Sequence, residues 1–121
     1  MVVGIDVYTD TSDSKKRTVT AFVSSMNANV GLPGFTDKPK TTAFTRWYSR
    51  CMMESKEQKY SDWLHIMMTG ALDKYHSING SYPDRIFVYR DGVSDHQFGL
   101  LKEFEIEPMK EACKQLDPTW K

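Results

Sequence analysis

The chain has 121 residues, with 16 Lys and Arg balanced by 16 Asp and Glu, so its formal net charge is zero. Its length suits one domain with one hydrophobic core. The balance of 40% hydrophobic and 26% charged residues is typical of a folded globular protein. A net charge of zero argues against a self-sufficient basic module that binds nucleic acid through many phosphate contacts.

Several other classes of protein are disfavoured by the composition. No apolar run approaches the roughly 20 residues of a membrane span, and the first residues lack the features of a secretion signal. Two cysteines, Cys51 and Cys113, are too few for a disulfide scaffold. We expect both to be reduced and packed as small apolar groups.

The first part of the chain predicts three strands. Residues 2–8 are a β-branched apolar run that predicts a buried strand. Residues 18–26 begin with alternating polar and apolar side chains, which predicts a second strand joined to the first by a hairpin. Residues 27–43 contain two Gly and two Pro and predict a surface loop insertion. Residues 44–51 predict a third strand.

A long amphipathic helix is predicted from about Lys56 to Asn79. Ser55 and Gln58 have the spacing of a capping box at its start, and Gly80 supplies a stop. Apolar residues recur at steps of three and four along one face, at Tyr60, Leu64, Met67, Ala71, Tyr75 and Ile78.

A strand over residues 85–90 follows this helix directly, so a right-handed crossover would pair it parallel to an earlier strand. An apolar patch over residues 98–104 comes next, and Pro108 opens a last helix. The order β-β-β-α-β-α predicts an α/β protein with a mixed sheet, as at the start of an RNase H-like fold. A ferredoxin-like or other α+β sandwich is the alternative on periodicity alone.

Two carboxylates stand out as candidate metal ligands. Asp6 lies inside an apolar strand, where an isolated carboxylate is costly unless it is paired, solvated or bound to a metal. Asp91 lies just past the carboxyl end of another strand, where parallel sheets bind ligands. If these strands are neighbours, the pair can hold Mg²⁺ or Mn²⁺, which favour oxygen ligands. Alternatively, Asp91 merely opens a turn and Asp6 ends a strand.

The remaining polar residues carry weaker signals. His65 and His76 are too far apart on one helix to share an ion, and His96 is expected at the surface. Arg90 is a candidate ion-pair partner for Asp91. Arg46 and Arg50 are candidates for contacts with a nucleic-acid backbone, or they form the solvent-exposed face of an amphipathic strand.

Two segments of the chain carry a family resemblance, namely residues 1–8 and Val88-Tyr89-Arg90-Asp91-Gly92-Val93-Ser94-Asp95. The first resembles the opening strand of the PIWI domain of Piwi-clade Argonaute proteins, and the second closely matches the Tyr-Arg-Asp-Gly-Val hallmark of that domain. Residues 45–51 and 68–72 also resemble Piwi segments, in the expected order. The resemblance covers almost the whole chain and identifies residues 1–121 as part of a PIWI domain, incomplete at its C-terminus.

The resemblance implies a fold, partners and a chemistry. It implies an RNase H-like domain that, within a larger protein, holds a small guide RNA and a target RNA in Piwi-interacting-RNA (piRNA)-guided silencing, with no membrane and no small-molecule substrate. Active members cleave the target with a metal-dependent acidic tetrad, whose first two aspartates fall on Asp6 and Asp91. The expected cofactor is Mg²⁺ or Mn²⁺. The expected location is the cytoplasm, with germ granules or the nucleus as alternatives.

The sequence departs from the family pattern at the catalytic glutamate. The family spacing places that residue on Lys59, with Glu57 and Glu54 nearby, and a lysine offers no acceptor to a metal. The last member of the tetrad would lie beyond residue 121. We therefore expect the isolated chain to be inactive as an endoribonuclease. The alternatives are a catalytically inactive RNA-binding or scaffold relative of the same fold, and another RNase H-like nuclease.

Overall fold

The structure, a computed structural model, describes residues 1–12, 14, 17–27, 46–53 and 60–120. Its strands are β1 (Val2–Asp10), β2 (Arg17–Ser25), β3 (Trp47–Met53) and β4 (Phe87–Arg90). Its helices are α1 (Tyr60–Asn79), α2 (Phe98–Leu101) and α3 (Glu107–Leu116), with a 3₁₀ turn at Asp95–Gln97 and a π-helical turn at Lys102–Ile106. No helix among these residues is long and apolar enough to cross a membrane.

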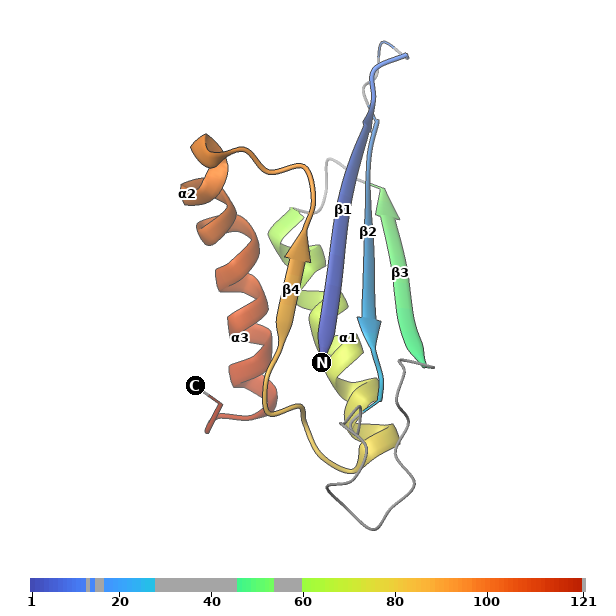
Figure 1. Ribbon diagram of the computed structural model, residues 1–121, viewed down its shortest axis with the longest axis vertical. Helices are drawn as coiled ribbons and strands as arrows, with labels where there is room; N and C mark the ends of the chain where they lie inside the picture. Colours follow the sequence, from blue (N-terminus) through green and yellow to red (C-terminus); the bar gives the residue numbers. More distant parts are fainter. Residues whose placement is uncertain (13, 15–16, 28–45, 54–59, 121) are drawn as a thin grey trace, which may run out of the picture.

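The four strands form one mixed sheet in the order β3-β2-β1-β4 (Figure 1). β1 pairs antiparallel with β2, and β2 pairs antiparallel with β3. β4 pairs parallel with β1 after the crossover through α1. The predicted element order and the parallel pairing are therefore confirmed, and the mixed α/β class is that of an RNase H-like sheet.

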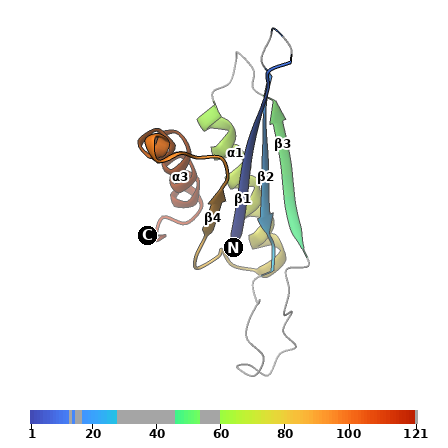
Figure 2. The ribbon, with the colours of Figure 1, turned by 45° about the horizontal axis from the view of Figure 1, so that its top comes forward.

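Both long helices lie on the same side of the sheet (Figures 1 and 2). Side chains alternate between the two faces of a strand, so Val3 and Ile5 of β1 and Phe22 of β2 point toward the helices and are buried. The predicted apolar stripe of α1 meets them, with Leu64 and Ala71 wholly buried. The opposite face of the sheet, called here the open face, carries exposed side chains such as Asp6 and Tyr8.

Element boundaries differ modestly from those predicted. β1 runs two residues further than expected, β3 extends to Met53, and β4 begins only at Phe87. Most of the predicted loop at 27–43 and the predicted capping box of α1 lie outside the described residues.

The chain between β4 and the last helix was predicted incorrectly. Residues 95–116 are helical almost without a break, rather than an apolar patch followed by a helix that begins at Pro108. Proline has no main-chain N–H to donate to a carbonyl of the preceding helical turn. The π-helical turn at Lys102–Ile106 shifts the hydrogen-bonding register just before it, and the helix continues through Pro108.

The two cysteines have different environments. Cys113 is buried in the core, as predicted, but Cys51 is exposed. The prediction for Cys51 was wrong because β3 is an edge strand of the sheet and the Cys51 side chain, opposite Ala21 of β2, lies on the open face.

Candidate metal centre

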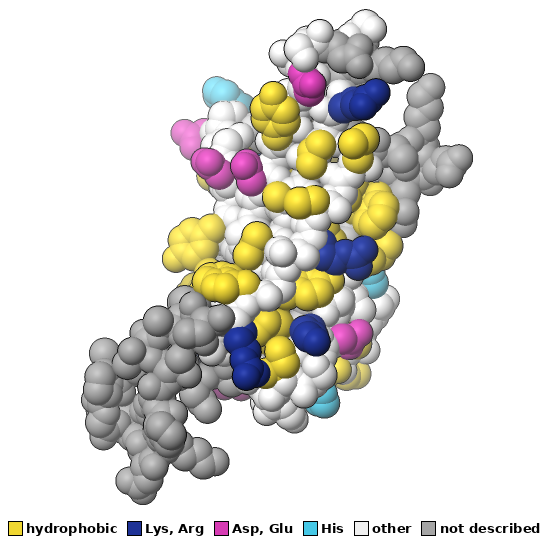
Figure 3. Space-filling model, turned by 90° about the vertical axis from the view of Figure 1, so that its right-hand side faces the viewer, with side chains coloured by type: hydrophobic (Ala, Val, Ile, Leu, Met, Phe, Trp, Pro, Cys, Tyr) yellow, Lys and Arg dark blue, Asp and Glu magenta, His cyan; other side chains and the backbone are white. Residues whose placement is uncertain are grey.

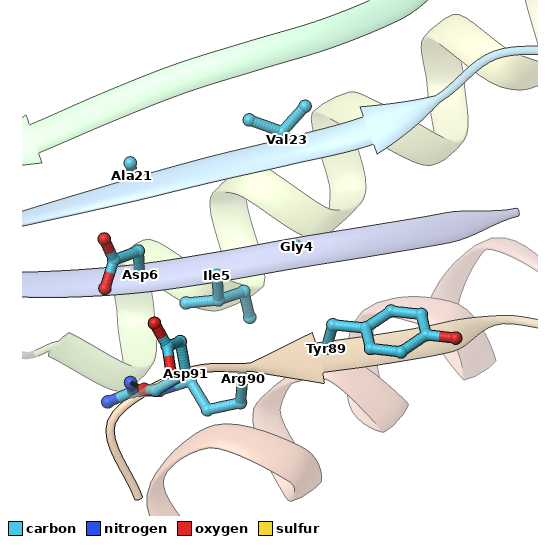
Figure 4. Close-up of a pocket in the computed structure, with 8 residues that line it drawn as sticks. All are labelled: Gly4, Ile5, Asp6, Ala21, Val23, Tyr89, Arg90 and Asp91. Atoms are coloured by element: carbon cyan, nitrogen blue, oxygen red, sulfur yellow. Dashed lines mark hydrogen bonds between the residues drawn. The ribbon is translucent and has the colours of Figure 1, made fainter. Parts of the chain in front are cut away.

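Asp6 and Asp91 lie side by side where β1 and β4 run parallel. The register pairs Ile5 with Arg90, and the main-chain N–H of Asp91 donates to the carbonyl of Ile5 at 3.4 Å. The residue that follows each of Ile5 and Arg90 is an aspartate, Asp6 within β1 and Asp91 directly after the end of β4. Both carboxylates line one cavity of about 440 Å³ on the open face, and Figure 4 shows them directed to the same side of the sheet.

The Asp6 carboxylate can lie within an apolar strand because it remains in contact with water. The alternation of β1 puts Val3 and Ile5 against the helices and Asp6 on the open face, where its side chain is exposed. An exposed carboxylate keeps its hydration and has little desolvation cost. Its position therefore needs no buried partner.

The turn after β4 orients the Asp91 carboxylate. The N–H of Gly92 donates to Asp91 Oδ1 at 2.8 Å, and Gly92 adopts a φ of 72°, which favours glycine. Among the described residues, no hydrogen bond or ion pair of the Asp6 carboxylate is found. The Asp91 carboxylate, which is held by the Gly92 N–H, and the Asp6 carboxylate, which has no such partner among the described residues, thus face the same cavity.

Arg90 does not pair with the side chain of Asp91, contrary to the prediction. Successive residues of β4 face opposite sides, so Arg90 points toward the helices while Asp91 points to the open face. Arg90 Nε donates to both carboxylate oxygens of Glu105, at 3.1 and 2.9 Å. Its Nη1 donates to the main-chain carbonyl of Asp91.

Glu105 forms the centre of a small buried network that the sequence reasoning missed. It is only 6% exposed and also accepts a hydrogen bond from the Tyr60 hydroxyl at 3.2 Å. Burial, reinforced by the Glu105 charge, raises the pKa of Tyr60. Burial alone would lower the pKa of Arg90, but the hydrogen bonds and charge of Glu105 raise it.

A signal for Glu105 was present in the sequence. It lies four and seven residues before the buried Met109 and Ala112, which places a carboxylate on the apolar stripe of a helix. A buried carboxylate requires a cationic or hydrogen-bonding partner. The apolar side chains of residues 98–104 hide this signal, because they predict an apolar patch rather than the start of that helix.

The pair of aspartates fits an oxygen-preferring divalent cation. Carboxylate oxygens are the ligands that Mg²⁺ and Mn²⁺ favour, and Arg90, which also lines the cavity, directs its side-chain hydrogen bonds to Glu105 and to the main chain of Asp91. Within the described part of the chain, no group of three or more His, Cys, Asp or Glu residues is arranged to hold a metal. Lys59, Glu57 and Glu54 lie outside that part.

The other polar residues considered are not brought to this centre. His76 packs against the Tyr82 ring with centroids 4.6 Å apart, and His96 is exposed in the 3₁₀ turn. Arg46 and Arg50 are exposed at β3. On the face shown in Figure 3, hydrophobic side chains lie among individual charged side chains. The described residues on this face form no continuous basic surface.

Comparison with known proteins gives consistent matches. The Piwi domain family model matches residues 1–121. The chain is 40% identical to Piwi-like protein Ago3 of Bombyx mori, over 91% of the chain and 10% of that protein. It is 34% identical to Piwi-like protein 1 of Danio rerio, over 96% of the chain and 12% of that protein. The chain thus spans about a tenth of the length of these relatives.

Solved structures share the fold. The MID-PIWI domains of N. crassa QDE-2 superpose with a TM-score of 0.70 at 22% identity, covering 98% of the chain and 31% of that structure. The C-terminal lobe of a budding yeast Argonaute gives a TM-score of 0.67, also at 22% identity, covering 98% of the chain and 21% of that structure. The arrangement of strands and helices described above is therefore that of an Argonaute PIWI domain.

Proposed function

This chain belongs to the Piwi domain family, and from that premise we propose that it contributes Asp6 and Asp91 as metal ligands to a protein that holds a small guide RNA and its target RNA. The observation that carries the proposal is the juxtaposition of the two aspartates on the parallel pair β1 and β4. Membership of the Piwi domain family supports a role in small-RNA-guided gene silencing, and we extend the proposal to a guide of the piRNA class.

The chain's residues prepare this centre in three ways. Asp6 and Asp91 supply negative charge and hard oxygen ligands on one side of the sheet. The N–H of Gly92 fixes the orientation of Asp91. Arg90 forms its ion pair with Glu105, so its side-chain hydrogen bonds are not made with the two carboxylates.

Mg²⁺ or Mn²⁺ would supply, when bound, the Lewis acidity that activates water for attack on a phosphodiester and stabilises the leaving oxygen. That chemistry is the proposed route to target RNA cleavage in the larger protein. We propose the cytoplasm as its location.

A titration of the chain with Mn²⁺ tests the metal ligands. We expect saturable binding that weakens by at least about tenfold in Asp6→Asn and in Asp91→Asn, because losing even an outer-shell partner of a metal site costs that much. Asp73→Asn is the matched control, since it removes the same charge from an exposed position on α1. Equal Mn²⁺ affinity in Asp91→Asn and the unaltered chain would contradict the proposal.

A second candidate function is an RNA-binding or scaffold protein of the same family without cleavage. One observation favours it: Lys59 occupies the expected place of the glutamate, and a lysine offers no acceptor to a metal. The same titration distinguishes the two, because a centre that has lost its metal role should bind Mn²⁺ no better than Asp91→Asn.

A further inference from the structure

We propose that Glu105 is a positioning residue for the candidate metal centre: it binds the Arg90 guanidinium, which in turn fixes the Asp91 main chain, and it thereby prevents this cation from pairing with the two carboxylates. The inference rests on the proposed metal role of Asp6 and Asp91. It assigns a function to a buried ion pair whose presence is by itself weak evidence for stability.

The first step of the argument is the geometry around Arg90. Its Nε donates to both oxygens of Glu105, at 3.1 and 2.9 Å, and its Nη1 donates to the main-chain carbonyl of Asp91. One guanidinium therefore connects Glu105 to the residue that carries the candidate ligand. The planar fork of arginine makes such a connection directional, which a lysine would not achieve.

The second step concerns burial. The side chains of Arg90 and Glu105 are 18% and 9% exposed, and Tyr60 at the start of α1 donates a third hydrogen bond to Glu105. Charge-assisted hydrogen bonds shielded from water are strong and hold one geometry. The network thus joins α1, the end of β4 and the π-helical turn that contains Glu105, and such turns occur often at functional sites.

The third step concerns where Arg90 would turn without Glu105. It immediately precedes Asp91, and the negative charge of Asp6 already acts on it. With its buried counter-charge removed, the guanidinium would be left unpaired, which is unfavourable in a buried position. The nearby Asp6 and Asp91 carboxylates are then its available partners, and pairing with them would compete with a metal ion.

The experiment compares Glu105→Gln with Glu103→Gln in the full chain. Both variants remove one negative charge from the same π-helical turn, but Glu103 is exposed. We expect Glu105→Gln to weaken Mn²⁺ binding roughly tenfold, as loss of an outer-shell partner does, and Glu103→Gln to leave it unchanged. Equal affinity in the two variants would overturn the proposal.

A metal-free readout separates this proposal from the proposed function. The amide N–H of Gly92 bonds to Asp91 Oδ1, so its NMR resonance reports the orientation of that carboxylate. We expect this resonance to shift in Glu105→Gln and to stay in place in Glu103→Gln. If the Gly92 resonance shifts in Glu105→Gln but the unaltered chain binds no Mn²⁺, the metal role is rejected and the positioning role is retained. If the resonance does not move in Glu105→Gln, the positioning role itself is rejected.

A double variant covers the case in which Glu105→Gln does not fold. Apolar replacement of a whole buried ion pair is often neutral for stability, so Arg90→Met combined with Glu105→Met should fold. If Glu105 and Arg90 position Asp91, this variant binds Mn²⁺ more weakly than the unaltered chain. If the pair serves only stability, the folded double variant keeps the Mn²⁺ affinity of the unaltered chain, which would refute the inference.

Discussion

At the scale of single residues, the environment of a side chain depends on which face of its element it occupies. Asp6 is next to the buried Ile5 and yet is exposed, and Asp91 is next to the half-buried Arg90 and faces the opposite side. Strand alternation explains both differences. Neighbours in the sequence can therefore have unrelated chemical roles, one in the core and one on the open face.

The two cysteines provide a test at this scale. Burial raises the pKa of the Cys113 thiol to about 11, whereas Cys51 is exposed. Because the thiolate is the reactive form, we expect iodoacetamide at pH 8 to modify Cys51 rapidly and Cys113 only after urea is added. Mass spectrometry of the digested chain identifies the modified site. Equal rates at both cysteines would show that Cys113 is not buried in solution.

The same pKa shift predicts a pH dependence of stability. The unfolded chain ionises Cys113 near its ordinary pKa, while the folded chain retains the proton until a higher pH. The thiol's contribution to the free energy of unfolding is therefore present below about pH 9 and is lost as the pH rises toward about 11. Urea unfolding of Cys113→Ala should lack this component, and an identical pH profile in that variant would contradict it.

At the scale of elements, the approach of α1 to the sheet depends on a glycine. A Cβ added at Gly70 would lie 2.5 Å from the hydroxyl oxygen of Tyr48 and 3.4 Å from its ring carbon Cζ. The Tyr48 ring meets Phe22 edge-on, with centroids 6.4 Å apart. Glycine inside a helix is unfavourable for helix formation, and this close contact is the physical reason for its presence.

We expect Gly70→Ala to lower the free energy of unfolding by about 1 kcal/mol. Overpacking typically costs about 1–3 kcal/mol, and the better helix propensity of alanine offsets about 1 kcal/mol of that. Adding Tyr48→Phe removes the clashing hydroxyl and should make the double variant more stable than Gly70→Ala alone. Urea unfolding of Gly70→Ala, of Tyr48→Phe and of the double variant measures these effects, and additive effects of the two substitutions would contradict the proposed contact.

At the scale of the whole molecule, charge and the number of ligands limit what this chain does alone. Its formal net charge is zero, and phosphate contacts from basic residues dominate the affinity of proteins for nucleic acids. The described residues supply Asp6 and Asp91 to the candidate centre. The chain spans about a tenth of the length of the relatives that it matches, so RNA binding and cleavage are proposed for a larger protein.

We therefore expect the 121-residue chain to bind RNA weakly at physiological salt and to leave it uncleaved in Mg²⁺ or Mn²⁺. Fluorescence anisotropy with a short labelled RNA measures the first quantity, and gel electrophoresis of the same RNA measures the second. Metal-dependent cleavage that disappears in Asp91→Asn would show that the chain supplies a complete catalytic centre.

The sequence by itself determined the element order, the apolar stripe of α1 and the two aspartates, because each depends on local periodicity or on a short motif. The tertiary structure decided that Asp6 and Asp91 share one cavity, that Arg90 pairs with Glu105, and that Cys51 is exposed. These features depend on contacts between distant segments: Arg90 and Glu105 are 15 residues apart, and Tyr60 and Glu105 are 45 apart. Periodicity shows that a residue is buried, but only the packing of elements shows which partner it meets.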